Sequence, residues 1–248
     1  MKNYMLSDKN IVHKQKLEQS ILKKVAQNPL LEQFCQCYLS TFTPKCLQNE
    51  TVSTLHHFLI DQFDQFLKVI ESKKYNNIDI QSKSDYQASI SIICPNAQYL
   101  IFTLENVFKD FDITITKMYH PLLSVYINKN HKMTFIDFPK KDSDLFSMCY
   151  IECFNEHFKI DTKKLLQELN YRLTILQTVT SDSKKIIQSL SSVQHDVLKT
   201  PMPKLEFHNE WVKFLDWLSN ENFSFFGYTE FNIHKSSQRT TIKENTKN

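Results

Sequence analysis

Apolar residues recur at helical spacing through the first part of the chain. Residues 11–27 carry a mild helical pattern, and Pro29 can open a second helix that ends before Pro44. A third helix is predicted to begin after Asn49, its expected N-cap, and to run to Ile70. The chain is therefore expected to open with a group of helices.

The pattern changes after a polar stretch. Residues 72–85 are typical of a linker, although 77–82 could form a short strand, so the N-terminal helical segment is expected over residues 1–80. From Gln87, polar and apolar residues alternate as far as Cys94. This alternation predicts a strand with one buried face.

A helix with an apolar stripe follows that strand. Apolar residues recur at helical spacing from Ala97 to Phe111. A second strand is predicted over 112–128, and the proline in its middle, Pro121, indicates an edge strand or a bulge. Residues 133–138 are predicted to form a short return strand.

The rest of the chain predicts one strand, further helices and a last strand. Residues 145–154 have a strand pattern. Asp161 can cap a long helix with a leucine stripe that ends before Pro201. One more amphipathic helix over 207–218 leads into an aromatic strand, Phe223–Ile233.

The order of these elements predicts an α+β fold. From residue 86 it reads strand, helix, strand with a small hairpin, strand, helix, strand, which is the ferredoxin-like βαββαβ arrangement. This domain is expected over 86–233, with the extra helices between 182 and 219 decorating it. The polar tail, 234–248, is predicted to be disordered.

Composition narrows the classes of function. The chain has 248 residues, of which 41% are hydrophobic, and a net charge of +3. This weak charge argues against a nucleic-acid partner, and so does the small number of arginines, which are Arg172 and Arg239 alone. No apolar run approaches the roughly 20 residues of a membrane-spanning helix. We therefore expect no membrane partner and a cytoplasmic protein with six reduced cysteines.

The chain contains a single glycine, Gly227. Phosphate-binding loops need several glycines because their backbone turns tightly and approaches the phosphate closely. We therefore expect no standard dinucleotide site and no cofactor in this chain. The glycine itself lies in an aromatic strand pattern, which predicts a backbone reason such as a bulge, a bend or a close approach of another backbone.

Few residues suggest chemistry. Asn96, Ala97 and Gln98 lie where the first helix of the predicted domain begins, and free N–H groups there suit a carboxylate such as that of an amino-acid effector. Simple capping by Asn96 explains the same residues and is favoured. His120 could be a catalytic base or an effector contact, but no partner is apparent, and a structural histidine is favoured.

A metal site is not expected. Cys149, Cys153 and His157 recur every four residues, which would place them on one face of a helix. In the strand predicted there, the two cysteines lie about 13 Å apart, too far to share an ion. Cys35 and Cys37 have no second pair at zinc-ribbon spacing.

Several segments resemble one protein family. Phe223–Tyr228 and the residues around it resemble the "FTFLGYREY" signature of the large bacterial NAD-dependent glutamate dehydrogenases. Lys117–Val125, with its His-Pro pair, resembles "LVVHPVLRV". Ser89–Phe111 resembles "VEIVTDDMPFLVDSVTMELNRRG", and Phe146–Phe154 resembles the "SWIHVEID" strand. Phe34–Phe66 resembles the family's N-terminal helices, and the glycine match extends over Glu210–Phe231. Together these segments occur in the family's order and span nearly the whole chain.

The resemblance implies an ACT-like module in the N-terminal region of such an enzyme, tied to regulation and subunit contacts. The full enzyme would oxidatively deaminate L-glutamate to 2-oxoglutarate with NAD. Its catalytic and NAD-binding parts lie later and are absent here. The implied partners are the remaining domains or subunits, an amino-acid effector and a second copy in a homo-oligomer. A free-standing amino-acid-binding regulator and an inactive remnant are the alternatives.

The family's acidic loop is one point of departure. Where the family reads "DDMPFLVDS" after the first strand, this chain has Cys94–Thr103, without either acidic residue at the strand end. In ACT modules this strand-to-helix loop often holds an amino-acid effector. The departure therefore weakens the expectation that this chain binds one.

Overall fold

The computed structural model describes residues 2–130, 132–140, 143–199, 205–223, 225–227, 229, 231–235 and 240–244. They form two compact units, residues 1–173 and 174–248, which are described separately. Helices and an antiparallel sheet together make an α+β fold, as predicted. The division falls inside one long helix, and the ranges 1–80, 86–233 and 234–248 stay predictions.

The first unit opens with the expected helices, α1 (Lys2–Val25), α2 (Pro29–Ser40) and α3 (Val52–Ser72). The Asn28 side chain accepts a hydrogen bond from the backbone of Leu31, and Pro29 supplies the preorganised first turn of α2. The N-cap of α3 is Thr51, in a capping box with Thr54, so the prediction of Asn49 was wrong by two residues.

Six strands and one further helix follow in this unit. They are β1 (Asn77–Ser84), β2 (Gln87–Pro95), α4 (Leu100–Asp110), β3 (Thr114–Tyr119), β4 (Leu122–Ile127), β5 (Met133–Asp137) and β6 (Asp144–Phe154). The sheet order is β1-β2-β6-β4-β5, β3 also pairs with β6, and every pairing is antiparallel. The strand predicted over 112–128 is interrupted at His120 and Pro121, because proline cannot donate to the ladder.

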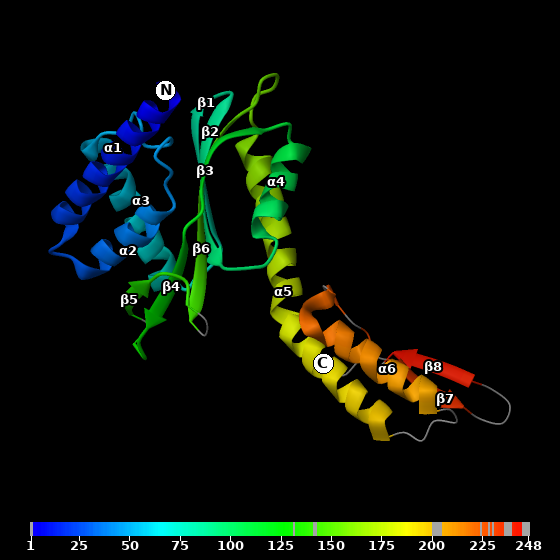
Figure 1. Ribbon diagram of the computed structural model, residues 1–248. Helices are drawn as coiled ribbons and strands as arrows, with labels where there is room; N and C mark the ends of the chain where they lie inside the picture. The colour runs from blue at the N-terminus through cyan, green and yellow to red at the C-terminus, as the bar shows by residue number, and fades with distance from the viewer. Residues whose placement is uncertain are drawn as a thin grey trace. The chain divides into compact units, whose positions relative to one another are not determined.

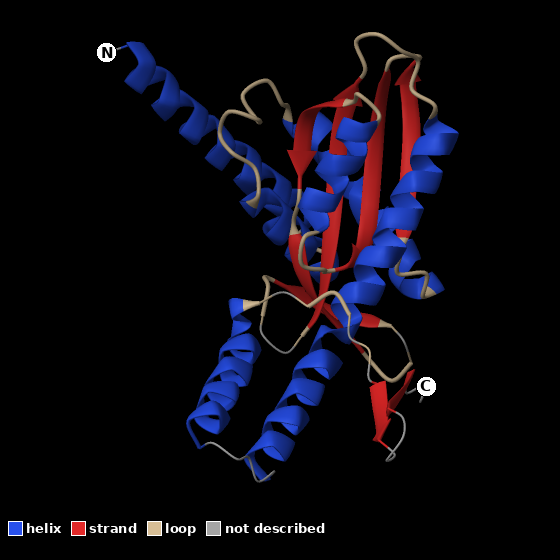
Figure 2. Cartoon of the chain, turned by 90° about the vertical axis from the view of Figure 1, so that its right-hand side faces the viewer, coloured by secondary structure: helices blue, strands red, loops and turns tan. Residues whose placement is uncertain are grey.

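Helices cover both faces of this sheet (Figure 1). Helices α1–α3 lie on one face, and α4 lies on the other with the start of α5 (Thr162–Lys199). Figure 2 views the sheet from the α4 side, with helices in front of the strands. The prediction that β2 has one buried face was wrong. Ser89 and Ser91 are also buried, because α3 covers their side and its Gln62 donates to Ser91 Oγ at 3.4 Å.

The core of the first unit has two halves, one on each side of the sheet. The half beneath α1–α3 is rich in aromatic rings, and the half beneath α4 and α5 is mostly aliphatic. The fully buried large side chains include Phe34, Tyr38, Phe66, Leu59, Ile93, Ile90, Ile92, Leu104 and Phe108. Burying residues of this size on both faces of a sheet provides the main stabilisation of such a domain.

The second unit holds the end of α5, helix α6 (Leu205–Trp217), a π-helical turn (Leu218–Asn222) and a two-stranded sheet of β7 (Phe231–Lys235) and β8 (Thr240–Glu244). Helix α5 contacts α6 through a hydrogen bond from Gln194 Nε2 to the Val212 carbonyl, 3.5 Å long. The buried apolar residues here include Ile186 and Leu215.

Two predictions for this unit need correction. The aromatic segment Phe223–Ile233 is not one strand of the main sheet. Among its described residues, those from Phe231 onward lie in β7, which pairs with β8. Strand β8 lies in the tail predicted to be disordered. Gly227 has no positive φ, and a Cβ built on it meets no described atom within 4 Å, so the structure gives no backbone reason for this glycine. Residues 224, 228 and 230 lie outside the described residues.

Candidate functional site

The first candidate site is the connection between β2 and α4. The Asn96 backbone N–H donates to the Leu145 carbonyl at 2.7 Å, and Ser147 Oγ donates to Asn96 Oδ1 at 2.8 Å. Asn96 therefore ties the end of β2 to β6. The prediction that Asn96 caps α4 was wrong, because the helix begins only at Leu100.

Tyr99 occupies the N-cap position of α4. Its backbone is left-handed, with φ 66° and ψ 13°, and its side chain makes no capping hydrogen bond. A bulky residue at positive φ is strained, and such strain is concentrated at functional sites. Beside it, Ala97 is buried and Gln98 is exposed. An effector carboxylate at this helix end would therefore meet the side chain of Gln98 and the positive end of the helix dipole.

His120 lies apart from these three residues. It sits between β3 and β4, level with Cys149 of β6, whereas Asn96 is level with Leu145. Four residues along β6 and two strand spacings separate the two backbones by roughly 16 Å. The structure therefore groups Asn96, Ala97 and Gln98, and it leaves His120 outside that group.

The His120 side chain is half-buried. Burial lowers the pKa of its imidazole, which is therefore neutral at pH 7. Its Nε2 is buried and has no hydrogen-bond partner among the described residues. A neutral imidazole without an orienting partner lacks the geometry of a general base.

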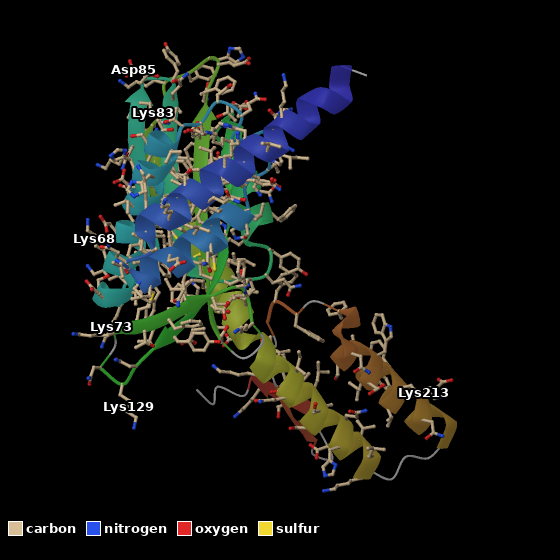
Figure 3. All side chains as sticks on the ribbon, turned by 60° about the vertical axis from the view of Figure 1, so that its left-hand side comes forward. Lys68, Lys73, Lys83, Asp85, Lys129 and Lys213 are labelled. Carbon is tan, nitrogen blue, oxygen red and sulfur yellow. The ribbon has the colours of Figure 1, made fainter. Side chains whose placement is uncertain are left out.

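The structure reveals a second polar cluster that the sequence analysis missed. Lys83 Nζ donates to Glu152 Oε1 at 3.0 Å, and the Tyr150 hydroxyl donates to the same oxygen at 3.0 Å. Lys117 Nζ lies 3.6 Å from Glu50 Oε1. We call Lys83, Lys117, Tyr150, Glu152 and Glu50 the Glu152 cluster. It joins β1, β3, β6 and the residue before the α3 cap at one end of the sheet, the end where Figure 3 labels Lys83.

The electrostatics of this cluster favour a structural role. Burial raises the pKa of Glu152, but the contacts with Lys83, Lys117 and Tyr150 outweigh it, so the pKa lies below its ordinary value. Burial is also the largest cause of the raised pKa of Tyr150. A carboxylate held ionised between lysines is a weak base, and a tyrosine held protonated is a poor acid. No sequence signal marks the cluster, since Lys83 and Glu152 are 69 residues apart.

The buried cysteines offer no reactive thiolate. Cys149 and Cys153 lie on the predicted strand, β6, and both are buried, while His157 follows the strand and is exposed. Burial raises the pKa of the Cys94 thiol to about 12, and it also raises that of Cys149. Among the described residues, no group of three His, Cys, Asp or Glu side chains could hold a metal ion.

The described surface also carries an open pocket at the end of α4. Its lining includes Glu105, Lys109, Asp112, Glu156 and His157. The acidic and basic groups are mixed there, so the pocket selects no single ligand charge. None of the residues predicted as effector contacts lines it.

No protein-family model matches this chain, and no curated protein matches it. Within the described residues, no helix is both long and apolar enough to cross a membrane.

Proposed function

We propose that this chain is a non-catalytic, ACT-like regulatory or structural domain from the N-terminal region of a large NAD-dependent glutamate dehydrogenase. The resemblance of its segments to that family motivates the proposal. The single structural observation that supports it is the split arrangement of β2, α4 and β3 around β6.

The strand order is close to the ferredoxin-like pattern. Strands β2 and β3 are both antiparallel to β6, so they run parallel to each other with β6 between them. Helix α4 connects them, and α5 follows β6 on the same face of the sheet as α4 (Figure 1). These elements correspond to the first five of the βαββαβ order, with β4 and β5 as additions.

The sixth element differs. In the ferredoxin-like order the last strand pairs antiparallel with the first, which here is β2. That position is occupied by β1, which precedes β2 in the chain and pairs with it antiparallel. We infer that β1 substitutes for the missing last strand, so that the sheet is completed from the N-terminal side.

A non-catalytic role agrees with the chemistry of the described side chains. The carboxylate of Glu152 is paired with lysine, and His120 Nε2 has no hydrogen-bond partner in the described part of the chain. The whole enzyme would supply NAD binding and oxidise L-glutamate through its other domains, and this chain would pack against them. An amino-acid effector would place its carboxylate at the start of α4, near Gln98.

Two measurements on the purified chain test this proposal. We expect no NADH formation from L-glutamate and NAD, and sustained turnover that scales with protein concentration would overturn the non-catalytic assignment. We also expect one amino acid to raise the melting temperature, since a ligand at 100 times its Kd adds about 2.7 kcal/mol of stability.

Matched variants locate the effector. Gln98→Ala should reduce the shift in melting temperature, whereas Gln15→Ala, at an exposed position of α1, should leave it unchanged. If none of the common amino acids shifts the melting temperature, the effector part of the proposal fails and the structural part remains.

A free-standing amino-acid-binding regulator is the second candidate. It is favoured by the completion of the sheet by β1, because residues 1–173 then need no later strand. The two candidates differ in their partners. A domain of a larger enzyme should bind a glutamate dehydrogenase lacking its N-terminal region, and a free-standing regulator or an inactive remnant should not.

A further inference from the structure

The six-stranded sheet has three strand edges that face away from its interior, and they are not equally protected. Strand β5 has five residues and lies against α2. Its Ile136 N–H donates a hydrogen bond to Gln33 Oε1 at 3.0 Å. Strand β3 has a register shift between Ile115 and Lys117 and is ended by Pro121. Bulges, prolines, short strands and covering elements are the usual means of blocking unwanted strand pairing.

Strand β1 has fewer of these protections, since its one register shift lies at its far end, between Ser82 and Ser84. It has eight residues and no proline, and it pairs with β2 without a register shift from Asn77 to Ser82. A lysine on an edge strand normally discourages pairing. Here Lys83 leans inward across β2 and donates to Glu152 at 3.0 Å. The regular part of the outer edge therefore carries no free lysine.

We propose that the outer edge of β1 pairs antiparallel with β1 of a second copy of this chain, around a two-fold axis at Ile80. Directly opposite residues in such a pair lie on the same face of the sheet. The two-fold axis must therefore pass between the two copies of one residue, which lie opposite each other. The two six-stranded sheets would then form one continuous sheet through the dimer. This inference does not depend on the proposed function.

The side chains of β1 select this axis. An axis at Asp79 would place two carboxylates opposite each other, which is unfavourable. An axis at Gln81 would place Lys83, next to the register shift between Ser82 and Ser84, only two residues from the axis, whereas an axis at Ile80 leaves it at the end of the pairing, opposite Asn77. With the axis at Ile80, each Ile80 meets its own copy, and Ile78 lies opposite Ser82 of the second copy.

The same register gives Asp79 a complementary partner. It lies opposite Gln81 of the second copy, twice in the dimer because of the symmetry. Within one chain, Gln81 Nε2 donates to Asp79 Oδ2 at 2.8 Å. The amide has a second N–H, which can donate to the Asp79 carboxylate of the second copy. Because β3 and β5 are protected, pairing would stop at the dimer and would not continue into a filament.

Cysteine cross-linking of the full chain tests the register. Cys46 is the one cysteine that is not buried, so the background is Cys46→Ser. In that background, Ile80→Cys places two thiols opposite each other at the axis, about 4.5–5.5 Å apart between Cβ atoms, and a mild oxidant should give a covalent dimer of twice 29.4 kDa. Ile78→Cys, on the same face, should not cross-link, because its own copy lies about 13 Å away along the strand.

Sedimentation of the unmodified chain and of two charge variants tests the pairing itself. We expect a concentration-dependent monomer–dimer equilibrium. Gln81→Asp places a carboxylate opposite each Asp79 and should weaken dimerisation about tenfold, whereas Gln81→Lys places a cation there and should keep or strengthen it. If a lysine on this edge blocks pairing whatever lies opposite it, Gln81→Lys should instead weaken dimerisation.

Several results would overturn the proposal. One is that the protein stays monomeric at all attainable concentrations. In that case, slow hydrogen exchange of the β1 amides would show that another segment covers the edge. The others are a dimer that cross-links through Ile78→Cys, and a dimer whose affinity is the same for both Gln81 variants.

Discussion

Residues 1–173 and residues 174–248 use similar amphipathic helices with very different results. In the first unit, α3 buries Leu59, Phe63 and Phe66 against the sheet and its neighbours. In the second, α6 has an equally regular apolar stripe, yet Trp211, Phe214 and Trp217 are each about half exposed, at 51%, 48% and 48%. The described core residues of the second unit are Leu176, Ile186 and Leu215.

The contrast shows that an amphipathic pattern predicts a helix but not the surface that covers it. The α6 rings contact one another, with centroids 6.1 Å apart for Trp211 and Phe214 and 6.3 Å for Phe214 and Trp217. Such contacts add little compared with burial in a packed core. We therefore expect the stability of the protein to reside in the first unit.

Separate expression of the two units gives the largest expected difference. Residues 1–173 should unfold cooperatively in urea, because both faces of their sheet are covered from within the unit. Residues 174–248 should show no cooperative transition, since few of the side chains described there are large and buried. The measurement is circular dichroism against urea concentration. A sharp transition in the second fragment, or none in the first, would contradict the comparison.

Matched truncations in the two units should differ in size. Leu59→Ala removes a fully buried side chain from α3 and should cost about 2–5 kcal/mol of unfolding free energy. Phe214→Ala removes a larger side chain from α6, but its half-exposed position should limit the cost to roughly 0.5 kcal/mol. Urea denaturation of the full chain measures both. Equal losses would mean that the α6 aromatic side chains are packed as well as the core.

The sequence pattern predicted most local structure in the first unit. The three N-terminal helices, β2, α4, β6 and the interruption at Pro121 follow from apolar spacing and proline positions. The polar stretch before Gln87 was assigned mainly as a linker, and β1 was only an option there. Its strand depends on pairing with β2, a tertiary contact that outweighs weak local propensity.

Long-range placement could not be predicted from periodicity. Phe223–Ile233 has a strand pattern, but nothing in that pattern specifies which strand it pairs with. The effector contacts proposed at the start of α4 stay a prediction. The cap was assigned to Asn96, and the helix starts three residues later than expected. The contact of Lys83 with Glu152 depends on strand register, which a single sequence does not encode in its spacing.

Acid titration of a carboxylate in each unit gives the smallest expected difference. The folded pKa of Glu152 lies below its unfolded value, mainly because the Lys83 and Lys117 contacts outweigh the effect of burial, which raises it. A lowered folded pKa contributes stability above the unfolded pKa, and that contribution is lost as the pH falls through the folded pKa. Glu152→Gln should therefore cost about 1 kcal/mol near neutral pH, and the cost should shrink towards zero in acid.

Glu210→Gln is the matched control, because it removes the same charge from an exposed position on α6. Near neutral pH its cost should be smaller than that of Glu152→Gln, because the position is exposed. The measurement is urea denaturation of the three proteins between neutral pH and the acid limit of folding. A Glu152→Gln cost that stays constant with pH would show that the variant acts through packing, since loss of an ion pair must disappear once the carboxylate is protonated in both states.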